Sequence, residues 1–518
     1  MHKKKCQNPK SEIRKKFKIR NLNFKFELFE FASDFVLRIS DFKWLFLCLI
    51  VIWCSGCAVG PKYKRPEVTV PTQYKEDDVW KNAQPTDAIS RGKWWEVFHD
   101  PELNSLEEQI SVSNQNLKSS EAQYREALAI VRQNRADYFP TITTSPSVTV
   151  SQASRNRAIV VGTGSNNTGT GTISGTTQNT TYSLPFDFSY EADVWGRVRK
   201  SVEAATENAQ ASAADLESVR LSLQAELATD YFELRSLDAQ EDVLNSTVTD
   251  YEKALRLTQL RHDSGIASGI DVAQAQTQLE TTRAQAIDLR VNRAQLEHAI
   301  AVLVGQAASA FSLNARPMEN SVPIAPPSLP SALLQRRPDI AAAERRVAAA
   351  NAQIGVTQTA FFPAIMLSAT GGFQSSSIAN WLTWPSRFWS LGPTVIQTIF
   401  DGGKRRAISD QAWAAYDSTV ADYRQNVLTA FQEVEDNLAA LSILADEANV
   451  QNAAVKAASN AVRISNNRYQ GGIGTYLEVL VAQNVLLTNQ RVEIDIMQRR
   501  LSASVLLIKA LGGGWGAA

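Results

Sequence analysis

The sequence predicts an α+β membrane protein built by internal duplication, in which each half supplies a β-hairpin and a pair of long helices. Three observations predict this class: landmark residues that recur at one offset, a strand-like run of alternating polarity, and two very long segments without glycine or proline. Four strands per chain are too few to close a barrel, because the smallest outer-membrane barrels use about eight. We therefore expect three copies to share one 12-stranded β-barrel, from which their helices extend.

Charge and composition exclude several function classes. The chain has 53 basic and 53 acidic side chains, but its first 57 residues hold 12 of the basic and only 5 of the acidic ones. The remainder is therefore mildly acidic, which argues against a nucleic-acid-binding protein. All four cysteines lie in those first 57 residues and the four histidines are scattered, so neither a disulfide framework nor a zinc centre is expected beyond them. No cofactor is expected either.

The N-terminal segment is expected to be an export signal. An apolar run at 44–53 follows Lys43 and has the length of a signal-peptide core, although a stop-transfer anchor is the alternative. About 42 residues before this lysine are too many for an ordinary n-region. We therefore expect translation to begin near Val36 or Leu37.

A lipid anchor is expected directly after this signal. Residues 54–57 (CSGC) resemble a bacterial lipobox, in which the last cysteine, here Cys57, is acylated and becomes the mature N-terminus. Several acyl chains would hold the protein durably, since a single chain binds a membrane only marginally. Ala58 stands where an inner-membrane retention signal has aspartate, which favours the outer membrane.

An internal repeat organises the rest of the chain. Eight residues recur 207 positions later, and Gly196 and Gly403 keep the same offset. The eight pairs are Arg261/Arg468, Gly265/Gly472, Ile266/Ile473, Val272/Val479, Ala275/Ala482, Gln276/Gln483, Leu279/Leu486 and Gly305/Gly512. Upstream, 138–140 (YFP) matches 361–363 (FFP) at an offset of 223, so the first half holds 16 extra residues. We place them in a Gly-, Ser-, Thr- and Asn-rich exposed loop at 151–181.

These boundaries divide the chain into six parts. A proline-rich junction separates the two repeats. The expected parts are an upstream extension and lipoprotein signal at 1–56, a lipid-anchored segment at 57–101, a first repeat at 102–305, a linker at 306–337, a second repeat at 338–512 and a tail at 513–518. Each repeat is expected to consist of a helix, a β-hairpin, a long helix, a tight turn and a second helix.

Alternating polarity predicts the strands. Residues 182–194 alternate over more than the 9 to 11 residues that a tilted membrane strand needs. Pro185 interrupts the run, which a position near a strand end would tolerate. Ile142, Val148 and Val150 predict a weaker partner strand, whereas a soluble β-sandwich edge is the alternative. The second half supplies a poorer copy, with possible interface tryptophans. The residues of that copy are Ile365, Leu367, Trp381, Trp384, Trp389, Leu391, Val395 and Ile399.

Two unbroken helices are predicted at 197–264 and 404–470, which contain 68 and 67 residues without glycine or proline. In the first helix, leucines and one valine recur at intervals of seven, four or three residues. This spacing predicts a seam along which the helix packs over its whole length. The seam is Leu216, Leu223, Leu227, Leu234, Leu237, Leu244, Val248 and Leu255. A glycine turn and a second helix of about 35 residues should follow each. A free-standing coiled coil is the alternative, which the interposed strands disfavour.

Four segments together resemble the TolC/OprM-type outer-membrane efflux proteins, specifically their NodT-like lipoprotein branch. They are 57–66 (CAVGPKYKRP), 94–103 (WWEVFHDPEL), 333–340 (LLQRRPDI) and 400–403 (FDGG). The resemblance covers the chain from Cys57 onward. It implies a homotrimer with a 12-stranded β-barrel, a 12-helix periplasmic α-barrel and a passive exit duct for small molecules. It further implies a periplasmic membrane-fusion adaptor and an inner-membrane pump, often of the RND class, as partners.

The resemblance also places a gate at the periplasmic helix tips. Tyr469 and Glu478 are the candidates for its constriction, with Arg468 in the same turn and with Asp271 and Arg261 from the first repeat beside it. Three-fold symmetry would repeat each charge as a ring. A solvated helix end with ordinary salt bridges is the alternative. Many relatives have Leu-Asp-Ala-Gln where this chain has LVAQ at 480–483, so we expect weaker block by divalent cations.

An enzyme is not expected. The sequence contains no phosphate-binding GxxxxGK[ST] loop, no HExxH motif and no GxSxG nucleophile elbow. Two other functions use similar architecture: a duct for polypeptide (type I) secretion, and a trimeric adhesin, which two hairpin-bearing repeats disfavour. Neighbouring genes for an adaptor and an RND pump would favour small-molecule efflux over polypeptide secretion.

Overall fold

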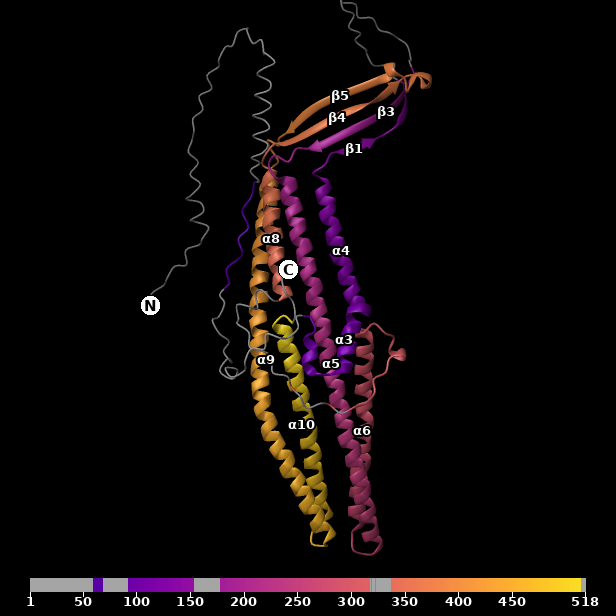
Figure 1. Cartoon of the computed structure of the whole chain (residues 1–518), viewed down its shortest axis with the longest axis vertical. Helices are drawn as coiled ribbons and strands as arrows, with labels where there is room; N and C mark the ends of the chain where they lie inside the picture. Colours follow the sequence, from indigo (N-terminus) through magenta and orange to yellow (C-terminus); the bar gives the residue numbers. More distant parts are fainter. Residues whose placement is uncertain are drawn as a thin grey trace, which may run out of the picture. The chain divides into compact units, whose positions relative to one another are not determined.

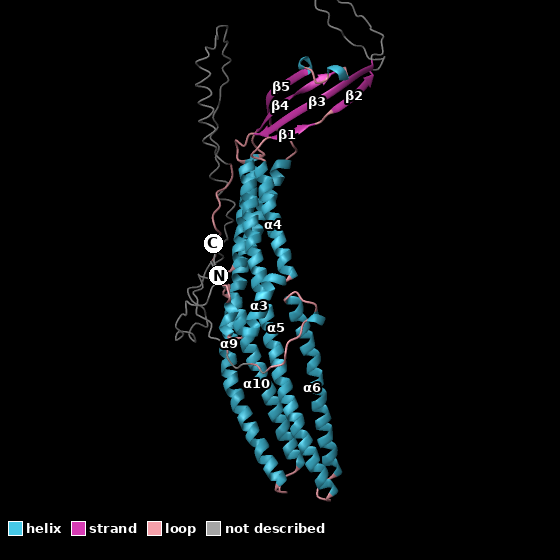
Figure 2. Ribbon diagram, turned by 45° about the vertical axis from the view of Figure 1, so that its right-hand side comes forward, coloured by secondary structure: helices cyan, strands magenta, loops and turns pink. Residues whose placement is uncertain are grey.

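A computed structural model describes residues 59–68, 92–152, 178–316, 318, 322 and 337–513. Helices lie side by side along most of this region, and one antiparallel sheet follows at one end of them (Figures 1 and 2). Cys57, the signal segment and most of the 151–181 tract lie outside the described residues. No helix among those described is long and apolar enough to cross a bilayer.

The two halves carry matching elements in the same order. The first half contains η2 (Trp94–Phe98), α3 (Pro101–Ser113), α4 (Gln115–Ala136), β1 (Thr141–Thr144), β2 (Ser147–Gln152), β3 (Gln178–Glu191), α5 (Arg197–Asp263), α6 (Gly269–Leu303) and η3 (Ala308–Ala310). The second contains α8 (Pro338–Thr359), β4 (Ala364–Ser375), η4 (Ile378–Asn380), η5 (Trp384–Ser386), β5 (Arg387–Ile396), α9 (Lys404–Gln470) and α10 (Tyr476–Ala510). The predicted long helices are confirmed to within one residue.

The predicted leucine seam of α5 is also confirmed. Four of its eight members, Leu223, Leu227, Leu234 and Leu244, are buried, and the other four are partly buried. Successive parts of the seam pack into different clusters along the helix, first against α3 and α10 and further on against α6 and α10. The seam therefore packs against several neighbouring helices in turn, as expected for a helix within a packed layer.

The sheet joins the two halves. Its order is β1-β3-β4-β5, with β2 pairing the same edge of β3 as β1, so five segments fill four strand positions. The central pair, β3 and β4, brings Tyr182–Glu191 of the first half against Met366–Ser375 of the second. The two outer edges of the sheet have no pairing partner among the described residues. One edge is formed by β1 and β2, and the other by β5.

The structure corrects three predictions about the strands. The main strand is Gln178–Glu191, so it begins inside the tract predicted to be a loop and ends before Val194. Pro185 lies in the middle of this strand, not near its end. It is tolerated because the chain opposite breaks between β1 and β2 at Ser145 and Pro146, where no ladder partner needs an N–H from β3. In the second half Ile399 lies beyond β5.

The helix predicted at the start of the first repeat is in fact two helices. Asn114 separates α3 from α4, and its Oδ1 accepts from the N–H of Leu117 at 2.9 Å, which caps α4. Its Nδ2 donates to the carbonyl of Leu303 at 2.8 Å. The break therefore fastens the end of α6 to the first repeat.

A buried carboxyl group lies in the main apolar core. Glu107 of α3 is 0 % exposed, and neither of its oxygens has a hydrogen-bond partner among the described residues. It lies on the same helix face as Leu103 and Ile110, which pack in that core. Burial raises the pKa of Glu107 well above its usual 4.5.

Glu107→Gln is therefore expected to raise the unfolding temperature at pH 7 to 8. The unfolded chain ionises above about pH 4.5 while the folded chain keeps the proton, so stability falls as pH rises between the two pKa values. The amide imitates the protonated acid and removes this loss. Thermal unfolding at pH 4 and pH 8 tests it, with the exposed Glu126→Gln on α4 as the control. A gain from Glu107→Gln that is as large at pH 4 would contradict it.

Candidate functional site: the helix tips

Two tight turns meet at the end of the helices away from the sheet (Figure 1). The α5–α6 turn and the α9–α10 turn contain Gly265 and Gly472, whose φ angles are 73° and 75°. Because only glycine adopts this left-handed region readily, the repeated glycines mark the turns. The turns are joined by a hydrogen bond of 3.0 Å from Nη2 of Arg261 to the carbonyl of Gln470.

Tyr469 is the central residue of this contact. Its ring is buried at 7 % exposure, and the guanidinium carbon of Arg261 lies 4.3 Å from the ring centroid. Its hydroxyl is 3.1 Å from Oγ1 of Thr258, which is also buried. Stacking and hydrogen bonding therefore fasten α9 to α5, the helix of the other repeat.

The remaining predicted residues make contacts within their own hairpins. Arg468 pairs with Glu478 at 3.6 Å between Nε and Oε2, and both side chains are about half exposed. Asp271 forms a capping box with Ser268 at the start of α6. The structure thus brings Arg261 to Tyr469 and Arg468 to Glu478, whereas Asp271 caps a helix.

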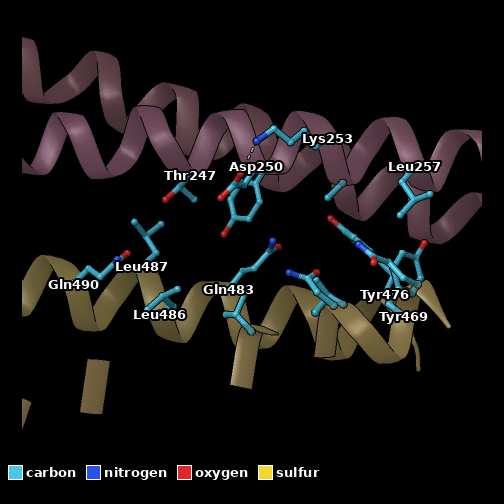
Figure 3. A pocket seen from close by; sticks show the side chains of 16 residues that line it. Thr247, Asp250, Lys253, Leu257, Tyr469, Tyr476, Gln483, Leu486, Leu487 and Gln490 are labelled. Carbon is cyan, nitrogen blue, oxygen red and sulfur yellow. Dashed lines mark hydrogen bonds and ion pairs between the residues drawn. The ribbon is translucent and has the colours of Figure 1, made fainter. Parts of the chain in front are cut away.

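A cavity of about 280 Å³ lies beside Tyr469, between α5, α9 and α10. Tyr251 of α5 lines it. Tyr476 and Gln483 line it from α10 (Figure 3). The hydroxyl of Tyr476 and Oε1 of Gln483 are buried without a hydrogen-bond partner among the described residues. Burial, with smaller contributions from Tyr251, Tyr469 and Asp271, raises the pKa of Tyr476 to about 12.

Sequence reasoning missed Thr258, Tyr251 and Tyr476. Tyr476 begins α10 on the far side of the glycine turn from Tyr469, so no helical spacing links the two residues in the sequence. Thr258 gave no signal either, because its partner is 211 residues away in the chain. The side chains that fasten the tips therefore come from both repeats.

A second charged cluster lies midway along the helices. Asp238 of α5 is buried and accepts from Nη1 of Arg235 and from Nε of Arg293, both at 2.7 Å. Arg235 also donates to Glu102 at the start of α3, at 2.6 Å. The backbone N–H of Arg316, beyond η3, donates to the same Asp238 carboxylate at 3.3 Å. These bonds join α3, α5, α6 and the start of the linker.

The sheet exposes large apolar side chains. Trp389, Leu391 and Val395 of β5 alternate along one face and are all exposed, Trp389 by 81 %. Trp384 and Leu382, in the β4–β5 connection, are exposed as well. An apolar face of this kind marks contact with a partner or with lipid.

The chain just after Cys57 is held at the junction of sheet and helices. The N–H of Val59 donates to the carbonyl of Trp195 at 3.0 Å, between β3 and α5. Nδ2 of Asn351 in α8 donates to the carbonyl of Pro61 at 3.1 Å.

Comparisons with known proteins agree with this architecture. The sequence model of a family described as outer membrane efflux protein matches residues 106–306 and 329–513. A probable efflux pump outer membrane protein, TtgC of Pseudomonas putida, is 33 % identical over 476 residues, which is 91 % of this chain and 95 % of that protein. The pyoverdine export outer membrane protein OpmQ of Pseudomonas aeruginosa is 31 % identical over 469 residues, 90 % of this chain and 95 % of that protein.

Solved structures give the same result. The outer-membrane channel OprN superposes with a TM-score of 0.80 at 28 % identity and covers 89 % of this chain and 100 % of its own. The outer membrane protein VceC of Vibrio cholerae has a TM-score of 0.73 at 29 % identity and covers 83 % of this chain and 99 % of its own.

Proposed function

We propose that three copies of this chain, which belongs to the outer membrane efflux protein family, form one lipid-anchored exit duct through the outer membrane. The chain is an outer-membrane efflux channel component, and its family is not enzymatic. The observation that carries the trimer is the open sheet: four strand positions whose outer edge on each side is unpaired among the residues that the structure describes. In lipid such edges leave backbone groups without partners, so three sheets would close a 12-stranded barrel.

The exposed face of the sheet supports its place in the bilayer. Trp389, Leu391 and Val395 would face lipid from β5, with Trp384 near the interface, where tryptophan is favoured. The helices would continue the duct into the periplasm as a 12-helix barrel. This arrangement leaves the turns of α5–α6 and α9–α10 at the periplasmic end.

The position of Val59 supports the lipid anchor. Val59, two residues after Cys57, is bonded to Trp195 where the sheet meets the helices, and a thioether-linked lipid on Cys57 would therefore start near the level of the bilayer surface. We propose that residues 1–56 are removed and that acyl chains on Cys57 insert beside the barrel.

The expected partners are a periplasmic membrane-fusion adaptor and an inner-membrane pump, which we propose to be of the RND class. Relatives are described as antibiotic, toluene and solvent efflux pump proteins and as a pyoverdine exporter. We therefore propose small organic molecules as cargo. Export energy comes from the pump, because a duct of this kind is passive.

Native mass spectrometry of the detergent-solubilised protein tests the assembly. The expected result is a trimer of a chain that begins at Cys57 and carries the added mass of its acyl groups. A monomer that keeps its full secondary structure without detergent or lipid would overturn the proposal. Deletion of the gene, followed by accumulation assays with drugs, dyes and metals, would then identify the cargo.

The proposed gate is tested separately through Glu478. If three copies of Glu478 face the axis, Glu478→Gln removes the ring of charge and relieves block of the pore by divalent cations. Planar-bilayer conductance with and without Mg²⁺ measures this, and Glu493→Gln, on the same helix but fifteen residues beyond Glu478, is the control. Strong block that survives Glu478→Gln would remove this residue from the gate.

A further inference from the structure

The helices near the sheet form an open row. α4 packs on α5, α5 on α8 and α8 on α9, so the outer sides of α4 and α9 have no helix against them among the described residues. The same two helices connect to the open edges of the sheet, α4 through β1 and α9 through β5. If three sheets close a barrel, as proposed above, α9 of one copy comes beside α4 of the next.

Each of the two open helices carries a pair of exposed charges, and the two pairs are opposite in sign. Arg125 and Arg132 of α4 are exposed and make no ion pair with any described residue. The same is true of Asp410 and Asp417 of α9. Both pairs are separated by seven residues, so each pair forms a row along one side of its helix.

The charges match in depth below the sheet. Arg132 lies four residues before the end of α4 at Ala136, and Asp410 lies six residues after the start of α9. At 1.5 Å per residue, these are depths of about 6 and 9 Å. Arg125 and Asp417 lie at about 16 and 20 Å by the same measure. Each arginine is thus within about 4 Å of the depth of one aspartate.

The charges also match in direction. Val131 marks the side of α4 that packs on α5, and Tyr423 and Val427 mark the side of α9 that packs on α8. At 100° per residue, both charged rows lie about 110° around the helix from these buried sides. Because α4 runs toward the sheet and α9 away from it, and their buried sides face opposite ways, both rows come out on the same surface of the wall.

We infer that Arg125 pairs with Asp417, and Arg132 with Asp410, of the neighbouring copy, and that these pairs set the register of the three seams between protomers. The inference depends on the proposed trimer and adds which residues recognise the second copy. Three-fold symmetry repeats each pair three times, so a weak surface pair acts with triple effect on assembly.

Charge exchange on the full-length protein tests this inference. Arg125→Asp and Asp417→Arg are each expected to lower the ratio of trimer to monomer about tenfold or more in native mass spectrometry at low salt, because like charges meet in three seams. The double variant is expected to restore it. The effect of each single variant should shrink in 1 M salt. Arg125→Asp with Asp422→Arg is the matched control, since Asp422 lies on another side of α9, and it should not restore assembly.

The outcomes separate the two proposals. A wild-type monomer would refute the trimer itself. A wild-type trimer that neither single variant weakens, or that the double variant fails to restore, would refute the seam alone. Weakening by Arg125→Asp with no effect of Asp417→Arg would instead assign the arginines to another anionic ligand, such as a lipid headgroup, and would also refute the seam. Parallel exchange of Arg132 and Asp410 repeats the test if Arg125→Asp fails to fold.

Discussion

Asp238→Asn is expected to cost about 3 kcal/mol of folding free energy, the lower end of the range typical of breaking a buried ion pair from one side, because Arg235 keeps Glu102 and Arg293 keeps Glu297. The asparagine leaves Arg235, which is 2 % exposed, and most of Arg293 facing a neutral amide. The amide NH₂ group would also place a donor where one acceptor oxygen of the carboxylate had been. The cost is high because these guanidinium groups cannot lose their charge and have little water around them.

Thermal unfolding of the purified protein measures this loss. Asp250→Asn is the matched control, because Asp250 lies on the same helix and pairs with Lys253 at 3.1 Å, but both side chains are mostly exposed. It should have little effect. Equal changes in unfolding temperature for the two variants would show that the buried cluster does not stabilise the junction of α3, α5, α6 and the linker.

Tyr469→Ala is expected to open the helix tips. The substitution removes a buried ring, which costs about 3 to 5 kcal/mol for a large aromatic, together with its contacts to Arg261 and Thr258. About 5.5 kcal/mol moves a two-state equilibrium from 1:99 to 99:1, so this loss is large enough to shift a closed tip substantially toward open. Tyr469→Phe loses only the hydroxyl contact, about 1 kcal/mol, and should have a smaller effect.

Planar-bilayer conductance compares the three proteins, with Arg463→Ala, an exposed change on α9, as the control. The expected order of conductance is Tyr469→Ala, then Tyr469→Phe, then wild type. Wild-type conductance in Tyr469→Ala would show that the Tyr469 contact does not hold the tips closed. Cells that express the alanine variant should also become more sensitive to large hydrophilic antibiotics.

The helical part of the fold was predictable because its determinants are local. Segments without glycine or proline set the bounds of α5 and α9, and the spacing of leucines predicted packing along all of α5. The break at Asn114 was missed, because its reason is a hydrogen bond to Leu303, 189 residues away. A cap that depends on a distant carbonyl leaves no local pattern.

The strands were predicted less well because pairing decides them. Alternating polarity located the centre of β3 but not its first four residues, which are polar and become a strand by pairing with β2. The place of Pro185 could be explained only from the break in the chain opposite. The tip residues show the same division: the repeat and the family resemblance indicated Tyr469, whereas Thr258 and Tyr251 became evident only from their contacts.

By itself the sequence determined the duplication, the lengths of the long helices, the glycine turns and the family, because each of these depends on residue type and spacing along the chain. Only the tertiary structure decided which residues of the two repeats meet: the β3–β4 pairing, the Arg261–Tyr469–Thr258 contact and the buried Asp238 cluster. The physical reason is that these interactions join groups far apart in the chain. Their strength depends on burial and distance, which exist only once the helices have packed.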